Sequence, residues 1–231
     1  MARHFLFYLK SLGLTVHSWS RRSATAPLPL PLKEALRDCS VILILVSDPA
    51  IEEIAQEFPD RLCFHFSGSL VTPFAHGAHP LMSFGPELYP LAEYEKIPFI
   101  LEMDAERVFK QAFPALKNPT HLIRKEDKTR YHALCAMAGG LSSLLWAKLF
   151  SELESSFGIP PEAAVPFLER VSRNLATHPQ TPERFFTGPI IRGDHAAVAR
   201  HLEALSNDPY RAVYQSFESA YLANEREVQS P

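Results

Sequence analysis

Apolar residues in the first half of the chain follow two alternating patterns. Short, almost continuous apolar runs indicate strands, and VILILV at 41–46 has the β-branched composition of a strand buried on both faces. Between the runs, apolar residues recur every three or four positions, which is the spacing of a helix with one buried face. Strands are expected at 14–19, 40–47, 61–66, 97–102 and 120–125, and helices at 30–39, 49–58 and 104–113. This alternation predicts an α/β fold, a doubly wound parallel sheet with helices on its faces.

After about residue 126 the strand pattern disappears and the apolar spacing stays helical. Helices are expected at 127–157, 160–178, 195–205 and 209–226. Gly158 is placed to end the first of these helices, and Asp194 is placed to cap the third. The sequence therefore predicts an α/β domain at 1–125 followed by an all-helical domain at 126–231.

Composition narrows the possible partners. The formal net charge is −3, whereas nucleic-acid and anionic-membrane surfaces need concentrated lysine and arginine. No apolar run is long enough to span a bilayer and no signal peptide opens the chain, so we expect a cytoplasmic protein without a membrane partner. The three cysteines are widely separated, which predicts neither a disulfide framework nor a metal site. Only 9 glycines stand against 20 prolines, so the chain is poor in the residue that builds phosphate-binding loops.

A basic segment, HSWSRR, ends the first expected strand. Ligands of doubly wound folds bind at the carboxyl ends of strands, and the second strand of a dinucleotide-binding fold carries an acid for NAD or arginine with serine for NADP. Ser20, Arg21 and Arg22 stand at that place, and guanidinium groups bind phosphate in a bidentate manner. These residues favour the 2′-phosphate of NADP, and the alternative is a solvated basic turn.

The ends of the next two strands carry small polar residues. Val46, Ser47 and Asp48 close the run at 40–47, where they would contact the sugar or nicotinamide of a cofactor, unless Asp48 only caps the helix that follows. Ser67 and Gly68 in HFSGS follow the strand at 61–66 and offer a small surface with an accessible backbone. The first four of these residues are candidates for cofactor binding and Gly68 for substrate binding.

Two histidines and one tyrosine are candidates for the substrate site. His79 precedes Pro80 in the loop GAHPLMSFG, where an imidazole could donate a proton or bind the substrate. Tyr131 and His132 occupy the first turns of the helical domain, near the expected cleft between the domains. The alternative for His79 is a hydrogen-bonded structural role. Gly139 and Gly140, in the middle of the same helix, indicate a close helix crossing or a ligand that approaches the backbone.

The most distinctive local segment is FFTGPIIRGD at 185–194. Thr187 begins a tight turn, and Arg192 lies two positions before Asp194 at the start of a helix. Arg192 could bind an anionic substrate, or it could pair with Asp194 and hold the loop in place.

Taken in order, HFSGS, GAHPLMSF, YHALCAMA and TGPIIRGDHAAVARHLEAL resemble the Rossmann-like proteins that carry a C-terminal helical domain of unknown function. That family is often described as NADP oxidoreductase-like and is related to 6-phosphogluconate dehydrogenase, 3-hydroxyacid dehydrogenase and pyrroline-5-carboxylate reductase. The resemblance covers essentially the whole chain, and its TGPIxRGD and HPL-x-x-F elements are the most specific. It implies a dinucleotide-binding domain at 1–125, NADP as cofactor, and a small, anionic substrate in the cleft between the domains.

The resemblance also implies roles for the candidate residues. Catalysis is expected from His79 and His132. Cofactor binding is expected from Ser20, Arg21, Arg22, Val46, Ser47, Asp48 and Ser67. Substrate binding is expected from Gly68, Pro80, Tyr131, Thr187 and Arg192.

Two departures from the family pattern favour a different class of function. The chain contains no G-x-G-x-x-G turn, and Met1–Ala2–Arg3–His4–Phe5 resembles the helix that follows this turn in relatives. Gly140 stands where relatives tend to carry asparagine. The second hypothesis is therefore a non-catalytic dimeric binding or regulatory protein that keeps the dehydrogenase fold.

A homodimer is expected under both hypotheses. C-terminal helices commonly pair across subunits in the resembled group, and the helix near 209–224 carries a stripe of large side chains. The stripe consists of Tyr210, Val213, Tyr214, Phe217 and Tyr221. The alternative is that this stripe packs only on its own domain.

Overall fold

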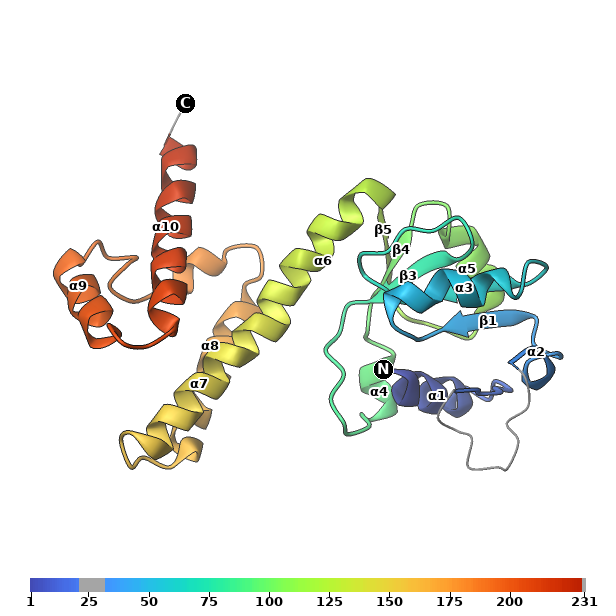
Figure 1. Ribbon diagram of the computed structural model, residues 1–231, viewed down its shortest axis with the longest axis horizontal. Helices are drawn as coiled ribbons and strands as arrows, with labels where there is room; N and C mark the ends of the chain where they lie inside the picture. Colours follow the sequence, from blue (N-terminus) through green and yellow to red (C-terminus); the bar gives the residue numbers. More distant parts are fainter. Residues whose placement is uncertain (21–31, 230–231) are drawn as a thin grey trace. The chain divides into compact units, whose positions relative to one another are not determined.

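The computed structural model describes residues 1–20 and 32–229, with side chains as far as residue 224. The chain forms two compact units, Met1–Lys148 and Leu149–Pro231 (Figure 1). The predicted boundary at 125/126 coincides with the end of the sheet, because strands stop at Ile123 and helices follow. The compact units instead divide between residues 148 and 149, within a long helix.

A five-stranded sheet forms the centre of the first unit. Its strands lie in the order in which they occur in the chain: β1 (Val41–Ile44), β2 (Leu62–His65), β3 (His76–Pro80), β4 (Phe99–Glu102) and β5 (Thr120–Ile123). Neighbouring strands are parallel except for β3 and β4, which are antiparallel. The predicted α/β class is confirmed, and the sheet is mixed rather than wholly parallel. The sequence pattern did not predict β3, because its residues HGAHP lack the β-branched run of the other strands.

Helices cover both faces of this sheet. The helices of the first unit are α1 (Ala2–Ser11), α2 (Leu32–Ala35), α3 (Ile51–Gln56), α4 (Leu91–Tyr94), α5 (Glu106–Ala112) and α6 (Lys128–Ala136), and α7 (Ser142–Ser155) crosses the division between the units. Phe5 of α1 and Phe109 of α5 share one core with Phe64 of β2. Ile51 of α3 packs on the opposite face with Ile42 of β1. Since β1 contributes alternate residues to both cores, the prediction of a strand buried on both faces is confirmed.

The expected strand at 14–19 is wrong. Residues 14–20 have no regular secondary structure, although Leu14 and Val16 are half-buried while Thr15 and His17 are exposed, as in a strand. A strand needs a neighbour for its backbone hydrogen bonds. Within the described residues, β1 pairs only with β2, so no ladder includes this segment. The alternation of half-buried and exposed side chains is typical of a strand, but it does not show whether a neighbouring strand is present.

The second unit is helical, as predicted. Its helices are α8 (Val165–Thr177), α9 (His195–Ala204) and α10 (Tyr210–Gln229), which follow the last turns of α7. The backbone N–H of Ala197 donates a 3.0 Å hydrogen bond to Oδ1 of Asp194, so the expected N-cap of α9 is confirmed.

One continuous helical stretch, Lys125–Ser155, is long and apolar enough to cross a membrane by length and composition. Polar residues interrupt this stretch, so the length of unbroken apolar runs does not reveal it. A single helix of this kind is weak evidence for a membrane protein, because core helices of soluble proteins meet the same criterion.

Candidate functional site

The ends of three neighbouring strands lie at one level beneath α6. In the sheet register, His65 of β2 stands opposite Gly77 of β3, and Ala78 stands opposite Leu101 of β4. Gly77 therefore lies level with Glu102, the last residue of β4, and His79 lies two residues farther along β3. Because alternate residues of a strand point to the same side, these four positions share one face of the sheet.

Tyr131 and His132 reach this face from α6. The hydroxyl of Tyr131 and Nδ1 of His79 share a hydrogen bond of 2.9 Å, and the two rings meet at 79°. The ring of His132 lies 5.5 Å from that of His79, centroid to centroid. It also lies against the backbone of Gly68, where any Cβ would collide with Cδ2 of the imidazole. The structure thus brings together four residues that the sequence singled out.

Burial keeps the side chains of His79 and Tyr131 uncharged near neutral pH. Burial, followed by the nearby His132 and Lys128, lowers the pKa of His79 to about 4. Burial and a hydrogen bond with Cys135 raise the pKa of Tyr131. A neutral imidazole therefore shares a hydrogen bond with a protonated phenol, an arrangement that can pass a proton to or from a reacting heteroatom.

A second polar contact joins the ends of β1 and β2. Ser67 donates a 2.7 Å hydrogen bond to Oδ2 of Asp48, and its Oγ accepts one of 3.0 Å from the backbone N–H of Leu70. The carboxylate of Asp48 does not cap the short 3₁₀ turn that it begins, so the alternative role as a helix cap is wrong. Val46 and Ser47 are exposed beside this contact.

A buried ion pair lies next to the His79 group. Nζ of Lys128 donates a 2.6 Å hydrogen bond to Oε1 of Glu102, and both side chains are almost fully buried. His65 is completely buried beside them, with Nε2 4.0 Å from the same carboxylate oxygen. Sequence reasoning missed all three residues. The available signal was Lys128 itself, which lies three and four positions before Tyr131 and His132 and therefore on their face of the helix.

The remaining candidates lie elsewhere. Ser20 is exposed after α1, and Arg21 and Arg22 lie outside the described residues. Thr187 and Arg192 are exposed in the second unit. Within the described part of that unit no ion pair joins Arg192 to Asp194, whose carboxylate caps α9.

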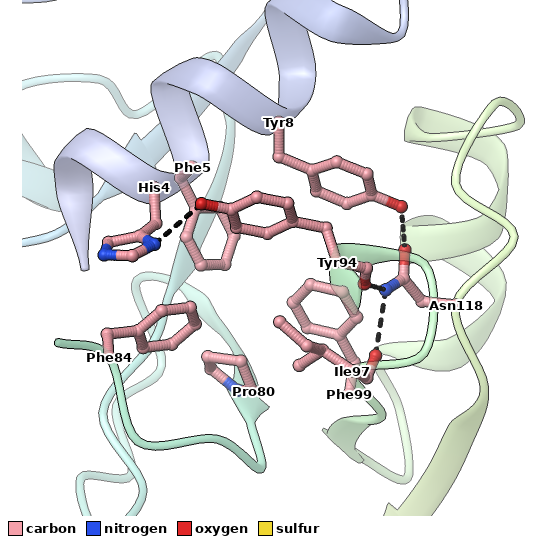
Figure 2. A pocket seen from close by; sticks show the side chains of 9 residues that line it. All are labelled: His4, Phe5, Tyr8, Pro80, Phe84, Tyr94, Ile97, Phe99 and Asn118. Atoms are coloured by element: carbon pink, nitrogen blue, oxygen red, sulfur yellow. Dashed lines mark hydrogen bonds between the residues drawn. The ribbon is translucent and has the colours of Figure 1, made fainter. Parts of the chain in front are cut away.

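Pro80 lies in the core of the first unit, and Gly140 lies in a π-helical turn. Pro80, expected to bind substrate, is fully buried and packs in a small pocket with His4, Tyr94 and Phe99 (Figure 2). Gly140 belongs to a π-helical turn, Met137–Leu141, and, apart from its own helix and chain neighbours, no atom of the described residues lies within 4 Å of where its Cβ would be. The close helix crossing or ligand approach expected at Gly140 stays a prediction.

The pocket in Figure 2 is a packing feature. Nδ1 of His4 lies 2.7 Å from the hydroxyl of Tyr94, and Nε2 lies 2.8 Å from the carbonyl of Gly85. A carbonyl only accepts, so Nε2 carries the proton and donates it, which leaves Nδ1 to accept from Tyr94. With both ring nitrogens engaged, His4 has no free polar group to offer a ligand.

Known structures share this fold. A candidate NADP oxidoreductase from Bacteroides fragilis is 18% identical with a TM-score of 0.73, covering 95% of this chain and 93% of its own. A protein from Thermotoga maritima is 23% identical with a TM-score of 0.64, covering 82% and 80%. An imine reductase from Streptomyces aurantiacus is 10% identical with a TM-score of 0.62, covering 96% and 91%. At these identities the likeness confirms the Rossmann-like fold.

Sequence comparison identifies the family. No curated protein matches the chain. A family model described as a domain of unknown function, DUF2520, matches residues 97–220. This region includes Glu102 and the whole of α6, and it spans more than half of the chain. The chain therefore belongs to the DUF2520 family.

Proposed function

We propose that this protein is an NADP-dependent oxidoreductase that acts on a small, anionic substrate. The observation that carries the proposal is the hydrogen bond between His79 and Tyr131, with His132 beside it, at the strand ends of a Rossmann-like sheet. The names of two similar structures, a candidate NADP oxidoreductase and an imine reductase, support the same class.

The residues at the end of β1 fit a dinucleotide. Val46 and Ser47 are exposed there, and Ser67 is held beside them by Asp48, which gives a small polar edge that a sugar or nicotinamide could contact. Ser20, Arg21 and Arg22 would bind the 2′-phosphate. A bound NADPH supplies hydride to an electrophilic carbon of the substrate.

The chain supplies the matching proton. As the double bond to the substrate's oxygen or nitrogen is reduced, that heteroatom takes up one proton. Tyr131 donates it and recovers one through His79, whose neutral ring can accept and release protons. His132 lies beside His79 and would orient the substrate. Gly68 leaves room for the His132 ring.

Binding experiments test the cofactor. NADPH and NADH are titrated into the protein by calorimetry, and NADPH is expected to bind more tightly. Arg21→Ala should weaken NADPH binding roughly tenfold or more and leave NADH unchanged, because a charge-assisted contact contributes about 1.5–3 kcal/mol. Arg200→Ala, an exposed arginine of α9, is the matched control. Equal affinity of the parent protein for both cofactors would refute the NADP preference.

Affinity should be low because the chain contains no G-x-G-x-x-G turn. That turn ordinarily supplies backbone amides and a helix dipole to the pyrophosphate. We expect a dissociation constant in the high-micromolar range or weaker. A sub-micromolar value would show that another segment takes the place of the glycine turn.

The second candidate is a non-catalytic binding or regulatory protein. It is favoured by Gly140, which contributes no side chain to the helix that carries Tyr131. NADPH oxidation by the parent protein, followed by absorbance over a panel of keto acids and cyclic imines, separates the two. Turnover that Tyr131→Phe abolishes without loss of NADPH binding supports the oxidoreductase. Binding without any turnover supports the second candidate.

The proposal includes a homodimer in the cytoplasm. On α10, Val213 and Phe217 are exposed, whereas Tyr214 contacts His201 of α9 through a 3.0 Å hydrogen bond. Light scattering should give about twice the chain mass of 26.0 kDa, and Phe217→Glu should lower the measured mass toward that of one chain.

Recovery of the native protein in the membrane fraction of cells would contradict the cytoplasmic location and point to Lys125–Ser155 as a membrane helix.

A further inference from the structure

The buried ion pair between Lys128 and Glu102 joins three separate segments of the first unit. Lys128 is the first residue of α6, and Glu102 is the last residue of β4. Nζ of Lys128 donates to Oε1 of Glu102 and also to the carbonyl oxygen of Leu70, in the loop after β2. One ammonium group therefore holds the start of α6 against both a strand end and a loop.

Gly77 makes room for this group. A Cβ at Gly77 would lie 2.5 Å from Nζ of Lys128 and 2.5 Å from Oε1 of Glu102. Both charged atoms therefore occupy the space above β3 that a side chain would otherwise fill. Strand β3 lies between β2 and β4. From its place above Gly77, Nζ of Lys128 therefore reaches both Glu102 at the end of β4 and the carbonyl oxygen of Leu70 after β2.

The start of α6 also positions the candidate proton-transfer residues. Tyr131 and His132 follow Lys128 by three and four positions, so all three side chains project from one face of α6. Tyr131 meets His79 of β3, and His132 lies on Gly68, two residues before Leu70. A shift of α6 at Lys128 would move both contacts at once, since both are made by the next turn.

We propose that Lys128 is a positioning residue for the site: through Glu102 and the carbonyl of Leu70, it holds α6 so that Tyr131 meets His79 and His132 meets Gly68. The functional meaning of this role rests on the proposed oxidoreductase activity, whereas the positioning itself can be measured without turnover.

The cluster is poorly arranged for stability alone. Burial of an ion pair carries a large desolvation cost, which is offset only when the remaining polar atoms are also hydrogen-bonded. Within the described residues, Oε2 of Glu102 and both ring nitrogens of His65 are buried without a hydrogen bond, and Nζ of Lys125 lies 3.8 Å from Oε2. An apolar set of side chains would fill this space at lower cost, so a role in placing α6 accounts better for the charges.

The titration of His79, followed by NMR of the histidine rings, measures this positioning. Lys128 and His132 are the charged or titratable groups that lower the pKa of His79, and Tyr131 is its hydrogen-bond partner. The Nδ1 chemical shift of His79 reports the bond to Tyr131, and Tyr131→Phe gives the reference for its loss.

Four variants separate positioning from a general effect on folding. Lys128→Met alone leaves Glu102 unpaired and could unfold the unit, so the decisive variant is the double change Lys128→Met with Glu102→Gln. Glu102→Gln alone keeps the ammonium and its bonds to an amide oxygen and to Leu70. Lys125→Met is the matched control, because that lysine lies near the other oxygen of Glu102 but is 40% exposed and bonds to Asp104.

In the folded double variant we expect the Nδ1 signal of His79 to move toward that of Tyr131→Phe, which reports loss of the bond, whereas a rise in the pKa of His79 already follows from removal of the Lys128 charge. Glu102→Gln and Lys125→Met should keep the parent values. A folded double variant with the parent Nδ1 signal would overturn the proposal, and so would loss of the bond in Lys125→Met. If the parent protein binds no NADPH, the proposed function fails while this measurement still decides the role of Lys128. If NADPH turnover is found, the double variant should lower kcat at least tenfold with little change in NADPH affinity.

Discussion

Tyr131 and His79 lie 52 positions apart in the chain and share a hydrogen bond of 2.9 Å. One residue lies on the second turn of α6 and the other near the end of β3, so the bond exists only when α6 lies on the sheet. Burial keeps the imidazole neutral and the phenol protonated, and both are the forms in which the pair can exchange a proton.

Removal of the Tyr131 hydroxyl should destabilise the first unit. Tyr131→Phe leaves Nδ1 of the partly buried His79 without a partner, which costs about 1–3 kcal/mol. Urea unfolding measures this cost. The chain offers a matched control in Tyr214→Phe, which breaks the exposed tyrosine–histidine bond to His201 and should change stability by less than about 1 kcal/mol. Equal costs at both sites would show that the His79 bond is solvated like the exposed one.

Two glycines should respond in opposite ways to alanine. Gly77→Ala places a Cβ among the buried atoms of Glu102 and Lys128, which are held by their own hydrogen bonds, and should cost about 2 kcal/mol. Gly140→Ala meets open space within a helix and should stabilise by about 0.5–1 kcal/mol. Thermal unfolding of the two variants measures both changes in stability. A destabilising Gly140→Ala would mean that another surface approaches this turn closely.

The strands that could be predicted from the sequence are those whose own side chains form an apolar run. The apolar runs at 40–47, 61–66, 97–102 and 120–125 contain β1, β2, β4 and β5. Strand β3 was missed because HGAHP gains its conformation from neighbours on both sides rather than from β-branched residues. The segment at 14–19 fails for the converse reason, since it has the side-chain pattern of a strand without a partner in the described sheet.

The candidate site was predictable only in part. His79, Tyr131, His132 and Gly68 were selected as polar or small residues at expected strand ends and helix starts, and the structure places them in contact. The pair of Lys128 and Glu102 was not selected, because a lysine at a helix start and a glutamate at a strand end ordinarily face solvent. Their burial depends on the register that sets Gly77 level with Glu102, and a single sequence does not contain that register.

Acid should destabilise the first unit through His65 and His79. Burial lowers the pKa of each to about 4 in the folded chain, against an ordinary value of 6.5. Between these values the unfolded state binds more protons, so the free energy of unfolding falls as the pH drops from about 6.5 to about 4. Each histidine accounts for a loss of at most about 3 kcal/mol.

Urea midpoints measured from pH 7.5 to pH 4.5 test this loss. Leucine has a volume similar to that of histidine, and His65→Leu breaks no hydrogen bond of the described residues. The variant should therefore lose less free energy of unfolding than the parent as the pH falls, while its stability at pH 7 stays nearly unchanged. His121→Leu, an exposed histidine of β5, serves as the control. An equal loss of stability at low pH in His65→Leu and in the parent would contradict the role given to His65.

Asn118 should be the most sensitive polar residue of the pocket in Figure 2, because it satisfies three buried groups at once. Its Oδ1 accepts a 2.6 Å hydrogen bond from Tyr8, and its Nδ2 donates to the carbonyls of Tyr94 at 2.6 Å and Ile97 at 2.9 Å. Burial raises the pKa of Tyr8 to about 12, so its hydroxyl stays protonated and needs an acceptor throughout the ordinary pH range.

Asn118→Ala leaves all three groups unpaired and should cost about 3 kcal/mol in the free energy of urea unfolding. Tyr8→Phe removes only the donor to Oδ1 and should cost about 1–2 kcal/mol. Ser11→Ala, which removes an exposed side-chain bond on the same helix as Tyr8, should stay within about 0.5 kcal/mol of the parent. Because Asn118 holds the segment between α4 and β4 to α1, its loss should also increase hydrogen exchange at Phe5 and Leu9. Exchange that stays at the parent rate would mean that the apolar contacts of α1 suffice to hold it on the sheet.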